Sequence, residues 1–197
     1  MQIDKEIVVG FPIRAITRTL CDGERQKLIE DFRTACARGT DNAASLAFVD
    51  SQLSAEPERS DVIHDVLAFL TTEMMELNKS KQEEVKGFLT WLEGYIGCVI
   101  EELTNKTKVK EYHKFDFDSL AAVLAQNRKK LSVSPDARAT IETIQPEFEK
   151  SIAKLDPLKA RIAATDRLID QIVYKLYGLS EEEIKIVEGE CEPTDAD

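Results

Sequence analysis

Two long stripes of apolar residues at helical spacing constrain the fold of this chain more than any other sequence feature. Spacings of three and four residues place side chains on one face of an α-helix, and a sustained seven-residue repeat is typical of a coiled coil. The first stripe comprises Ile63, Val66, Leu67, Leu70, Met74, Leu77, Val85, Phe88, Leu92, Ile96, Val99 and Leu103. The second repeats every seven residues and comprises Ile141, Phe148, Leu155, Ile162, Ile169 and Leu176.

Each of the two helices predicted by these stripes needs an apolar partner, and the stripes can cover each other. We therefore predict an all-α fold: a long antiparallel helical hairpin, coiled-coil-like, with short flanking helices and a short strand or extended arm at the N-terminus. Pro146 and Pro157 lie inside the seven-residue repeat. A proline removes a backbone hydrogen bond, so we expect kinks or short breaks at these two positions.

A polar segment, NKSKQEE, interrupts the first stripe. Leu77, Lys81 and Val85 are four residues apart and keep the helical phase across it. Ser80 and Glu83, however, match a capping box, which marks a helix start. We expect one continuous or bent helix of roughly forty residues, about 60 Å long, and both one helix and two remain open for residues 60–104.

Glycines, prolines and helix-capping residues divide the chain into four predicted segments. Residues 1–22 form an extended arm or short strand, residues 23–58 short helices, residues 59–189 the long hairpin with a basic loop at 104–115, and residues 190–197 an acidic disordered tail. The expected short helices are residues 25–37, residues 42–53, residues 119–131 with Asp118 as N-cap, and a last helix that follows Gly178 and is capped by Ser180 and Glu183.

Charge is unevenly distributed along the chain. The 197 residues hold 26 Lys and Arg against 37 Asp and Glu, a net charge of -11. Residues 180–197 hold eight acids and one base, a local charge of -7, so the rest of the chain carries only -4. A strongly basic, free-standing nucleic-acid binder is therefore not expected, but a locally basic surface is compatible with this distribution.

The cysteines and the apolar stretches indicate where the chain resides. The four cysteines are widely spaced, without a C-x-x-C pair or a secretory leader before them. Reduced cysteines in a cytoplasmic protein are the expectation. The uncharged apolar stretches are shorter than the ~18 residues that a membrane span needs, so no membrane role is expected.

The sequence does not carry a recognisable catalytic motif. The two histidines, His64 and His113, are far apart and have no Cys or His neighbour at metal-ligand spacing. A phosphate-binding G-x-x-x-x-G-K-[ST] loop and a G-x-S-x-G nucleophile turn are both missing. We expect no catalytic residue, no metal and no cofactor in this chain.

One polar cluster is a candidate binding site. Lysines alternate through the expected loop at 104–115, with a hydroxyl and two rings beside them, and more cations end the helix that follows. Such groups can hold phosphates without reading bases. The alternative is an ordinary solvated loop whose lysines balance nearby acids. The candidates for contact with DNA phosphates are Lys106, Thr107, Lys108, Lys110, Tyr112, His113, Lys114, Arg128, Lys129 and Lys130.

Two stretches carry a resemblance to a known family. They are SDVIHDVLAFLTTEMMELNKSKQEEVKGFLTWLEGYIG with LTNKTKVKEYH after it, and the ending ATDRLIDQIVYKLYGLSEEEIKIVEG, residues 164–189. Both resemble the C-terminal helical region of type IIG restriction-modification enzymes and related adenine-specific DNA methyltransferases. The motif residues of the ending, to which we assign a structural role in closing the hairpin, are Asp166, Leu168, Ile169, Asp170, Tyr174, Tyr177 and Gly178.

The resemblance implies that this region accompanies the target-recognition part of a larger enzyme that modifies or cuts DNA. The chain lacks the methyltransferase tetrapeptide Asn-Pro-Pro-Tyr and a Gly-rich turn for S-adenosylmethionine. No catalytic residue is therefore carried over. A DNA methyltransferase or restriction subunit or domain would be the partner, with duplex DNA backbone and a second copy of the chain as further partners.

These observations lead to two functional hypotheses. The first is a non-catalytic helical scaffold or spacer module of a DNA restriction-modification or DNA methylation system, associated with target recognition, that touches the phosphate backbone. The alternative is a free-standing coiled-coil adaptor that binds protein and not DNA. An acidic DNA mimic ranks below both, since the excess of acids is confined to residues 180–197.

Overall fold

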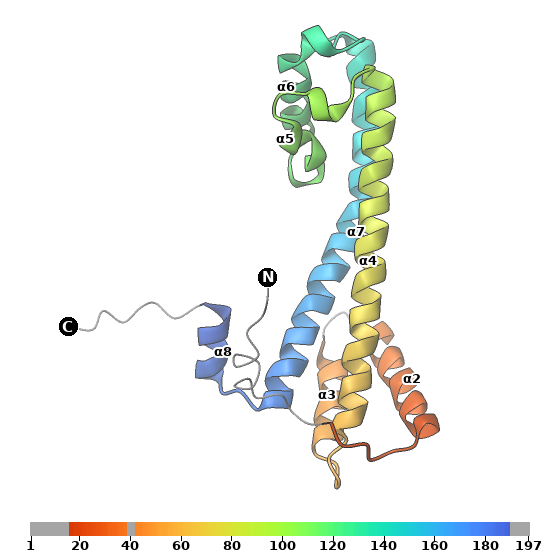
Figure 1. Ribbon diagram of the computed structural model, residues 1–197, viewed down its shortest axis with the longest axis vertical. Coiled ribbons are helices and arrows are strands. Elements are labelled where there is room, and N and C mark those ends of the chain that lie inside the picture. Colours follow the sequence, from red (N-terminus) through yellow and green to blue (C-terminus); the bar gives the residue numbers. More distant parts are fainter. Residues whose placement is uncertain (1–15, 39–41, 190–197) are drawn as a thin grey trace, which may run out of the picture. The chain divides into compact units, whose positions relative to one another are not determined.

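A computed structural model describes residues 16–38 and 42–189, and all regular secondary structure in these residues is helical (Figure 1). The prediction of an all-α fold is confirmed for this part of the chain. The strand or arm expected around Ile7–Val9 and the acidic tail expected at 190–197 lie outside the described residues.

The chain divides into two compact units. Unit 1 combines the residues before Glu73 with those after Ala164, and unit 2 is Glu73–Ala164. Two long helices contribute to both: α4 is Ser60–Ile96, of 37 residues, and α7 is Arg138–Tyr177, of 40 residues. The apolar stripes of the sequence therefore do become two long helices, and each supplies residues to two separate cores.

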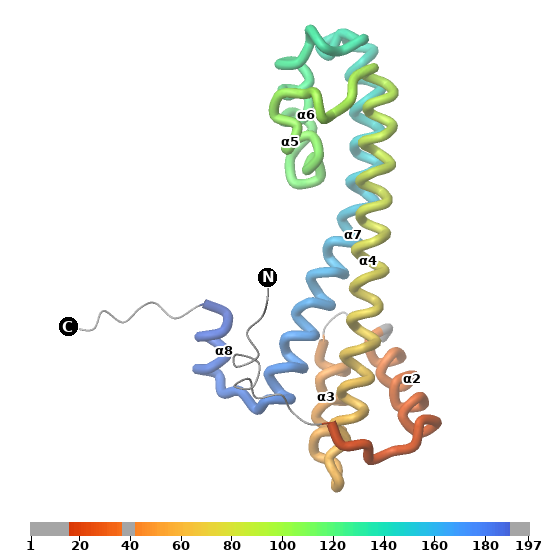
Figure 2. The backbone as a smooth tube through the Cα atoms, viewed as in Figure 1, coloured from red at the N-terminus to blue at the C-terminus, as the bar shows by residue number. Residues whose placement is uncertain are grey.

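Unit 1 contains the beginning of α4, the end of α7 and three shorter helices. The shorter helices are α2 (Asp22–Arg38), α3 (Ala43–Leu53) and α8 (Glu181–Glu188) (Figure 2). Helix α2 packs against α3. The buried core of unit 1 consists of Phe32, Val49, Ile63, Val66, Leu70, Leu168 and Ile172. Ile29 and Cys36 of α2 and Leu46 and Leu53 of α3 also pack against this core.

A buried carboxylate fastens the segment before α2 to the start of α4. Asp61 is 1% exposed, and its carboxylate accepts hydrogen bonds from the Thr19 amide (2.9 Å), the Thr19 hydroxyl (3.0 Å) and the Leu20 amide (3.2 Å). Burial alone would raise the pKa of Asp61, but these hydrogen bonds and one from Val62 outweigh it and lower the pKa. Asp61 is therefore charged and fully occupied by local donors.

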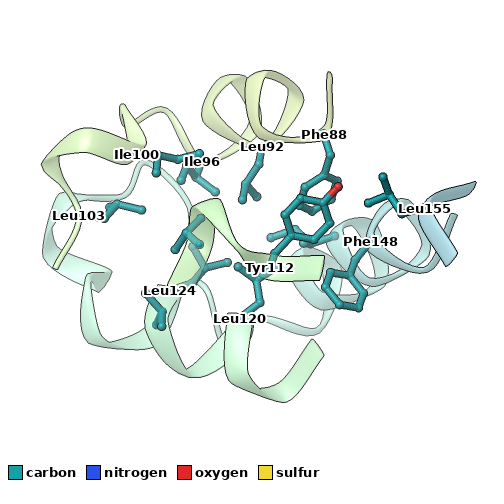
Figure 3. Close-up of a cluster of buried hydrophobic side chains, with 13 residues drawn as sticks. Phe88, Leu92, Ile96, Ile100, Leu103, Tyr112, Leu120, Leu124, Phe148 and Leu155 are labelled. Atoms are coloured by element: carbon teal, nitrogen blue, oxygen red, sulfur yellow. The ribbon is translucent and has the colours of Figure 1, made fainter. Parts of the chain in front are cut away.

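Unit 2 packs a chain of short helices against the second part of α4 and the first part of α7. In order they are η1 (Ile100–Glu102), α5 (Lys106–Lys110), η2 (Tyr112–Lys114), α6 (Phe117–Gln126) and η3 (Arg128–Lys130). α5 contacts both η1 and α6. Figure 3 shows the buried side chains that hold these elements together, which include Phe88, Leu92, Tyr112, Leu120, Phe148 and Leu155.

Helix α4 is continuous through the polar segment, so the capping box expected at Ser80 and Glu83 does not interrupt it. The helix ends at Ile96, before the last two residues of the predicted stripe. Gly97 follows with a φ of 66°, a left-handed conformation that an L-residue with a Cβ rarely adopts. Val99 is consequently 51% exposed and does not continue the stripe, whereas Leu103 is buried.

Two other local expectations differ from the structure. The segment expected to be a basic loop holds α5 and η2, and α6 begins earlier than the predicted helix because Asp116 is its N-cap and not Asp118. The Asp116 carboxylate accepts the Ser119 amide at 2.9 Å. Asp118 lies in the first turn, where its charge favours the positive end of the helix dipole. α6 also ends at Gln126, short of the predicted Leu131.

The two prolines do not break α7. Pro146 and Pro157 both lie inside the single helix Arg138–Tyr177, and both are exposed, as are Glu142 and Ala153 four residues before them. The carbonyl groups that each proline leaves without an amide partner therefore face water, which can satisfy them. The cost of an internal proline is smallest on such a solvent-facing side.

Candidate functional site

A surface groove of about 570 Å³ lies in unit 2 between α4 and the segment from η1 to η2. Val85 and Leu89 of α4 and Ile100 of η1 supply apolar surface to it. Four lysines surround this surface: Lys81 and Lys86 from α4, Lys110 from α5 and Lys114 from η2. The groove therefore combines an apolar floor with a cationic rim, and we call it the lysine-rimmed groove.

Acids in the rim are engaged with partners of the same unit. The Glu101 carboxylate binds both Lys110 and, at 2.9 Å, Lys106. Hydrogen bonds from Lys110 and then Lys106, together with their charges, lower the pKa of Glu101 to about 2. Glu111 pairs with Lys114 at 2.9 Å. Three of the predicted phosphate-contacting lysines are thus held in local ion pairs on the exposed surface.

The two lysines of the rim that come from α4 are different. Lys81 is half-buried and Lys86 is exposed, and neither forms an ion pair within the described residues. A lysine at such a boundary buries its aliphatic stem and keeps its ammonium group in contact with water. An anion that entered the groove at this end would find two uncompensated cations.

His113 lies beside these cations. Its Nδ1 is buried and has no hydrogen-bond partner among the described residues. Burial, and then the positive charges of Lys159, Lys81 and Lys114, lower the pKa of His113. The Lys159 ammonium also donates to the His113 carbonyl oxygen at 2.6 Å. The ring is therefore neutral at pH 7 in a locally cationic part of the groove.

Tyr112 is part of the core and not of the surface. The side chain is 1% exposed, lies 4.2 Å from the Phe88 ring between centroids, and places its hydroxyl 2.6 Å from the Ser151 Oγ of α7. Burial raises the pKa of Tyr112 to about 12, against the lowering effect of the hydrogen bond with Ser151. Of the predicted candidates, this residue is directed toward α7.

The remaining candidates are spread over the surface of unit 2. Arg128 pairs with Asp136. The Lys130 ammonium donates to the Glu102 carbonyl oxygen at 2.6 Å, which ties η3 to η1. Lys108 lies 5.8 Å from the centre of the Phe115 ring. Thr107, Lys108 and Lys129 are exposed, and Lys108 and Lys129 form no ion pair within the described residues.

Asn127, which sequence reasoning missed, holds this region in place. The residue is 3% exposed. Its side-chain oxygen accepts the Thr104 amide at 2.8 Å, and its side-chain nitrogen donates to the carbonyl oxygens of Thr104 (3.0 Å) and Val123 (2.9 Å). Asn127 therefore joins the end of α6 to the segment before α5, and these hydrogen bonds hold the basic segment in position.

The motif residues near the C-terminus divide between core and surface. Leu168 is buried, Ile169 is half-buried, and Asp166 and Asp170 are exposed on α7. Tyr177 is 46% exposed. Tyr174 is half-buried, and its partial desolvation, followed by the charges of Asp170 and Glu188, raises its pKa.

Gly178 has the conformation that the sequence predicted at the end of the long helix. Its φ of 64° is left-handed, and the Leu179 amide bonds back to the Tyr174 carbonyl at 3.0 Å. Ser180 and Glu183 then form the predicted capping box at the start of α8. These two predictions are confirmed, and they explain how the chain turns sharply between α7 and α8.

Across residues 16–38 and 42–189, three or more His, Cys, Asp or Glu side chains do not gather at any point in an arrangement that could hold a metal ion. The helices of the same residues include none that is both long enough and apolar enough to cross a membrane.

The groove was missed because its residues come from distant segments. One signal was available in the sequence: Lys81 occupies a position of the apolar stripe between Leu77 and Val85. A lysine at such a position is brought to the boundary of the core and needs either an anion or water there. The segment that faces it could not be read from spacing.

In residues 16–38 and 42–189 the chain is thus all-helical, with two cores to which the same two long helices contribute. It belongs to the family described as Domain of unknown function (DUF8810), whose model matches residues 60–173. The match includes most of both long helices and the whole of the basic segment. No curated protein and no solved structure matches the chain.

Proposed function

We propose that this chain is a non-catalytic helical scaffold, in which α4 and α7 pair as a long antiparallel hairpin. The observation that carries the proposal is the repeated use of the same two helices in both cores. In unit 1, Ile63 and Val66 of α4 share a core with Leu168 and Ile172 of α7. Two long helices that take part in two separate cores are better suited to holding partner proteins than to closing over a substrate.

Polar contacts within unit 2 support an antiparallel pairing. Glu73 of α4 binds Arg161 of α7. Further along α4, Glu84 accepts the Lys154 ammonium at 2.9 Å. The residue number increases along α4 as it decreases along α7, which is the relation between antiparallel helices.

The link to DNA restriction-modification or methylation rests on the resemblance of residues 60–97, 103–113 and 164–189 to the helical region of those enzymes. In that setting the chain would position recognition and catalytic parts supplied by a DNA methyltransferase or restriction subunit. Lys108 and Lys129, which are exposed and without an ion pair in the described residues, are the cations most available to DNA phosphates.

A second candidate function is a protein-binding adaptor without DNA contact. The local ion pairs favour it, because Lys106, Lys110, Lys114 and Arg128 already have carboxylate partners. A phosphate would have to compete with these carboxylates, and exposed ion pairs of this kind are each worth less than about 1 kcal/mol. A DNA phosphate can therefore displace these carboxylates, and measurement of DNA binding separates the two functions.

The test is fluorescence anisotropy of a labelled DNA duplex at increasing salt. The scaffold with DNA contact predicts binding that weakens steeply with salt and is reduced by Lys108→Gln with Lys129→Gln. Glu101→Gln should tighten binding, because it releases Lys106 and Lys110 from their shared carboxylate. Lys79→Gln is the matched control, since Lys79 is an exposed lysine of α4 outside this segment.

Absence of salt-dependent binding would reject the DNA contact and leave the adaptor. The scaffold itself is rejected if the purified chain, with S-adenosylmethionine and a DNA duplex, transfers methyl groups with turnover.

A further inference from the structure

Unit 2 includes one stretch of α4 and one stretch of α7 that contain no buried side chain. These stretches are residues 73–87 and residues 156–164, and the structure describes both in full. The next buried residues along the two helices are Phe88 and Leu155, which are 5% and 0% exposed and belong to the core of unit 2. Residues 73–87 alone make up roughly 20 Å of helix. We call the two stretches together the polar zone.

The face of α4 that buries Leu70 before this zone is mostly charged inside it. Glu73, Leu77, Lys81 and Glu84 follow Leu70 at spacings of three, four, four and three residues. Such spacings keep side chains on one face of a helix. Three of these four residues are charged, and all four are only half-buried. The apolar stripe is thus interrupted on the face where close packing against another helix would require it.

Ion pairs connect α4 with α7 in the polar zone and beside it. Glu73 binds Arg161, and Glu84 accepts the Lys154 ammonium at 2.9 Å. The side chains of Arg161 and Lys154 are 65% and 55% exposed. Exposed ion pairs of this kind contribute less than about 1 kcal/mol each, and a helix without apolar packing is only marginally stable in water. The polar zone is therefore held less strongly than the core beside it.

We propose that the polar zone opens locally, so that residues 73–87 and 156–164 separate and lose helical hydrogen bonds while the core of unit 2 stays folded. A segment opens locally where few buried apolar contacts are lost by opening. The inference rests on the antiparallel pairing of α4 and α7 proposed above, but it needs neither DNA nor a partner protein. Unit 2 then combines a stable core with an adaptable segment on the same two helices.

The experiment is hydrogen exchange of the full chain at pH 7, followed by mass spectrometry of peptides. Peptides from the polar zone should exchange at least about tenfold faster than peptides from residues 88–96 and 144–155, and still more slowly than the unfolded chain. Low concentrations of urea should hardly change exchange in the polar zone. Exchange in the core should accelerate, because opening of the core exposes much more surface to the denaturant.

Removal of the ion pairs should promote opening. Glu73→Gln with Glu84→Gln keeps the shape of both side chains and removes their charges. Exchange in the polar zone should become about two- to tenfold faster, and exchange in the core should stay the same. Glu76→Gln with Glu83→Gln is the matched control, because it removes the same charge from exposed positions of the same stretch. This control should leave both rates unchanged.

Restoration of the apolar stripe should have the opposite effect. Lys81 occupies a stripe position between Leu77 and Val85, so Lys81→Leu adds apolar contact on the face that the charges interrupt. Exchange in the polar zone should slow by about threefold or more. Lys79→Leu makes the same substitution at an exposed position two residues away and should not slow it.

Two results would overturn the proposal, and they differ in what they imply for the pairing. Exchange in the polar zone that is as slow as in the core would exclude local opening and leave the antiparallel pairing intact. Exchange as fast as in the unfolded chain, unaffected by either set of variants, would overturn both the opening and the pairing.

Discussion

Replacement of Tyr112 by phenylalanine should destabilise unit 2 although the ring stays in place. The substitution removes one hydroxyl, which lies 2.6 Å from the Ser151 Oγ in a site where both residues are at most 2% exposed. The tilted contact with the Phe88 ring, at 4.2 Å between ring centroids, is kept. The effect therefore reports on the hydrogen bond that joins η2 to α7.

The expected magnitude follows from the partner left behind. Removing one side of a buried hydrogen bond leaves the other without a partner and costs about 1–3 kcal/mol. Ser151→Ala should cost a similar amount for the same reason. The double variant removes both polar groups, so its loss of unfolding free energy should be clearly smaller than the sum of the single losses, by about 1 kcal/mol or more.

Urea denaturation followed by tryptophan fluorescence is a suitable assay. Trp91 is the only tryptophan of the chain, belongs to unit 2 and packs against Phe88 with ring centres 5.9 Å apart. The signal therefore follows unfolding of the unit in question. Additive losses, or a neutral Tyr112→Phe variant, would refute the reasoning.

The same pair gives a pH dependence of known sign. The pKa of Tyr112 is about 12 in the folded chain against 10.0 for a free tyrosine. The folded state thus holds the phenolic proton more tightly, which stabilises it fully below pH 10 and progressively less as the pH rises toward 12. Tyr112→Phe should remove this component, so the difference between the two proteins should shrink across that interval.

Two further predictions concern backbone and buried charge. Asp61→Asn should lower the unfolding free energy by about 1.5–3 kcal/mol at pH 7. Because the pKa of Asp61 is lowered on folding, this loss should disappear as the pH falls below 3.8. Denaturation followed by circular dichroism measures both effects. A wild-type advantage that persists at low pH would contradict it. Gly97→Ala should lower the unfolding free energy by at least about 1 kcal/mol, because Gly97 has a left-handed backbone and the nearby Ser132 side chain leaves no room for a Cβ. Gly94 lies inside a helix with open space around it, so Gly94→Ala should raise the unfolding free energy by about 0.5–1 kcal/mol. Equal effects of the two alanines would show that the turn after α4 tolerates a side chain.

The sequence predicted the long helices well because their apolar residues repeat over many turns. Phe148 and Leu155 of the seven-residue repeat are buried, as are Ile144 and Ile172, which each follow a residue of the repeat by three positions. Ile169, a member of the repeat, is only half-buried, while Leu168 beside it is buried. A straight helix has 3.6 residues per turn, so a strict seven-residue repeat drifts around it and neighbouring positions take over the buried face.

The short elements were predicted less well because single residues decide them. Asp116 and Asp118 are equally good N-cap residues in sequence, and only the bond from the Ser119 amide to Asp116 distinguishes them. The helical turns of α5 and η2 are held by the burial of Val109 and Tyr112 in a core whose other members are distant in sequence. Local patterns do not contain this information.

The sequence predicted which residue types the candidate site contains, but not which of them are free to bind a ligand. A cationic surface was expected around residues 104–114, and the lysines are there, but Glu101 and Glu111 neutralise most of them. The uncompensated cations of the groove, Lys81 and Lys86, come from α4 and meet the basic segment only after folding.

The pairing of α4 with α7 is the central claim, and site-directed crosslinking measures it most directly. In a chain whose native cysteines are replaced by serine, Glu84→Cys with Lys154→Cys occupies a pair of positions joined by a contact of 2.9 Å. Antiparallel pairing within one molecule predicts rapid linking by a short maleimide reagent, with the product at the mass of a single chain. A second pair, Glu84→Cys with Arg138→Cys, places the partner cysteine at the other end of the α7 segment and should link slowly. Equal rates for the two pairs, or products only at the mass of two chains, would contradict the hairpin.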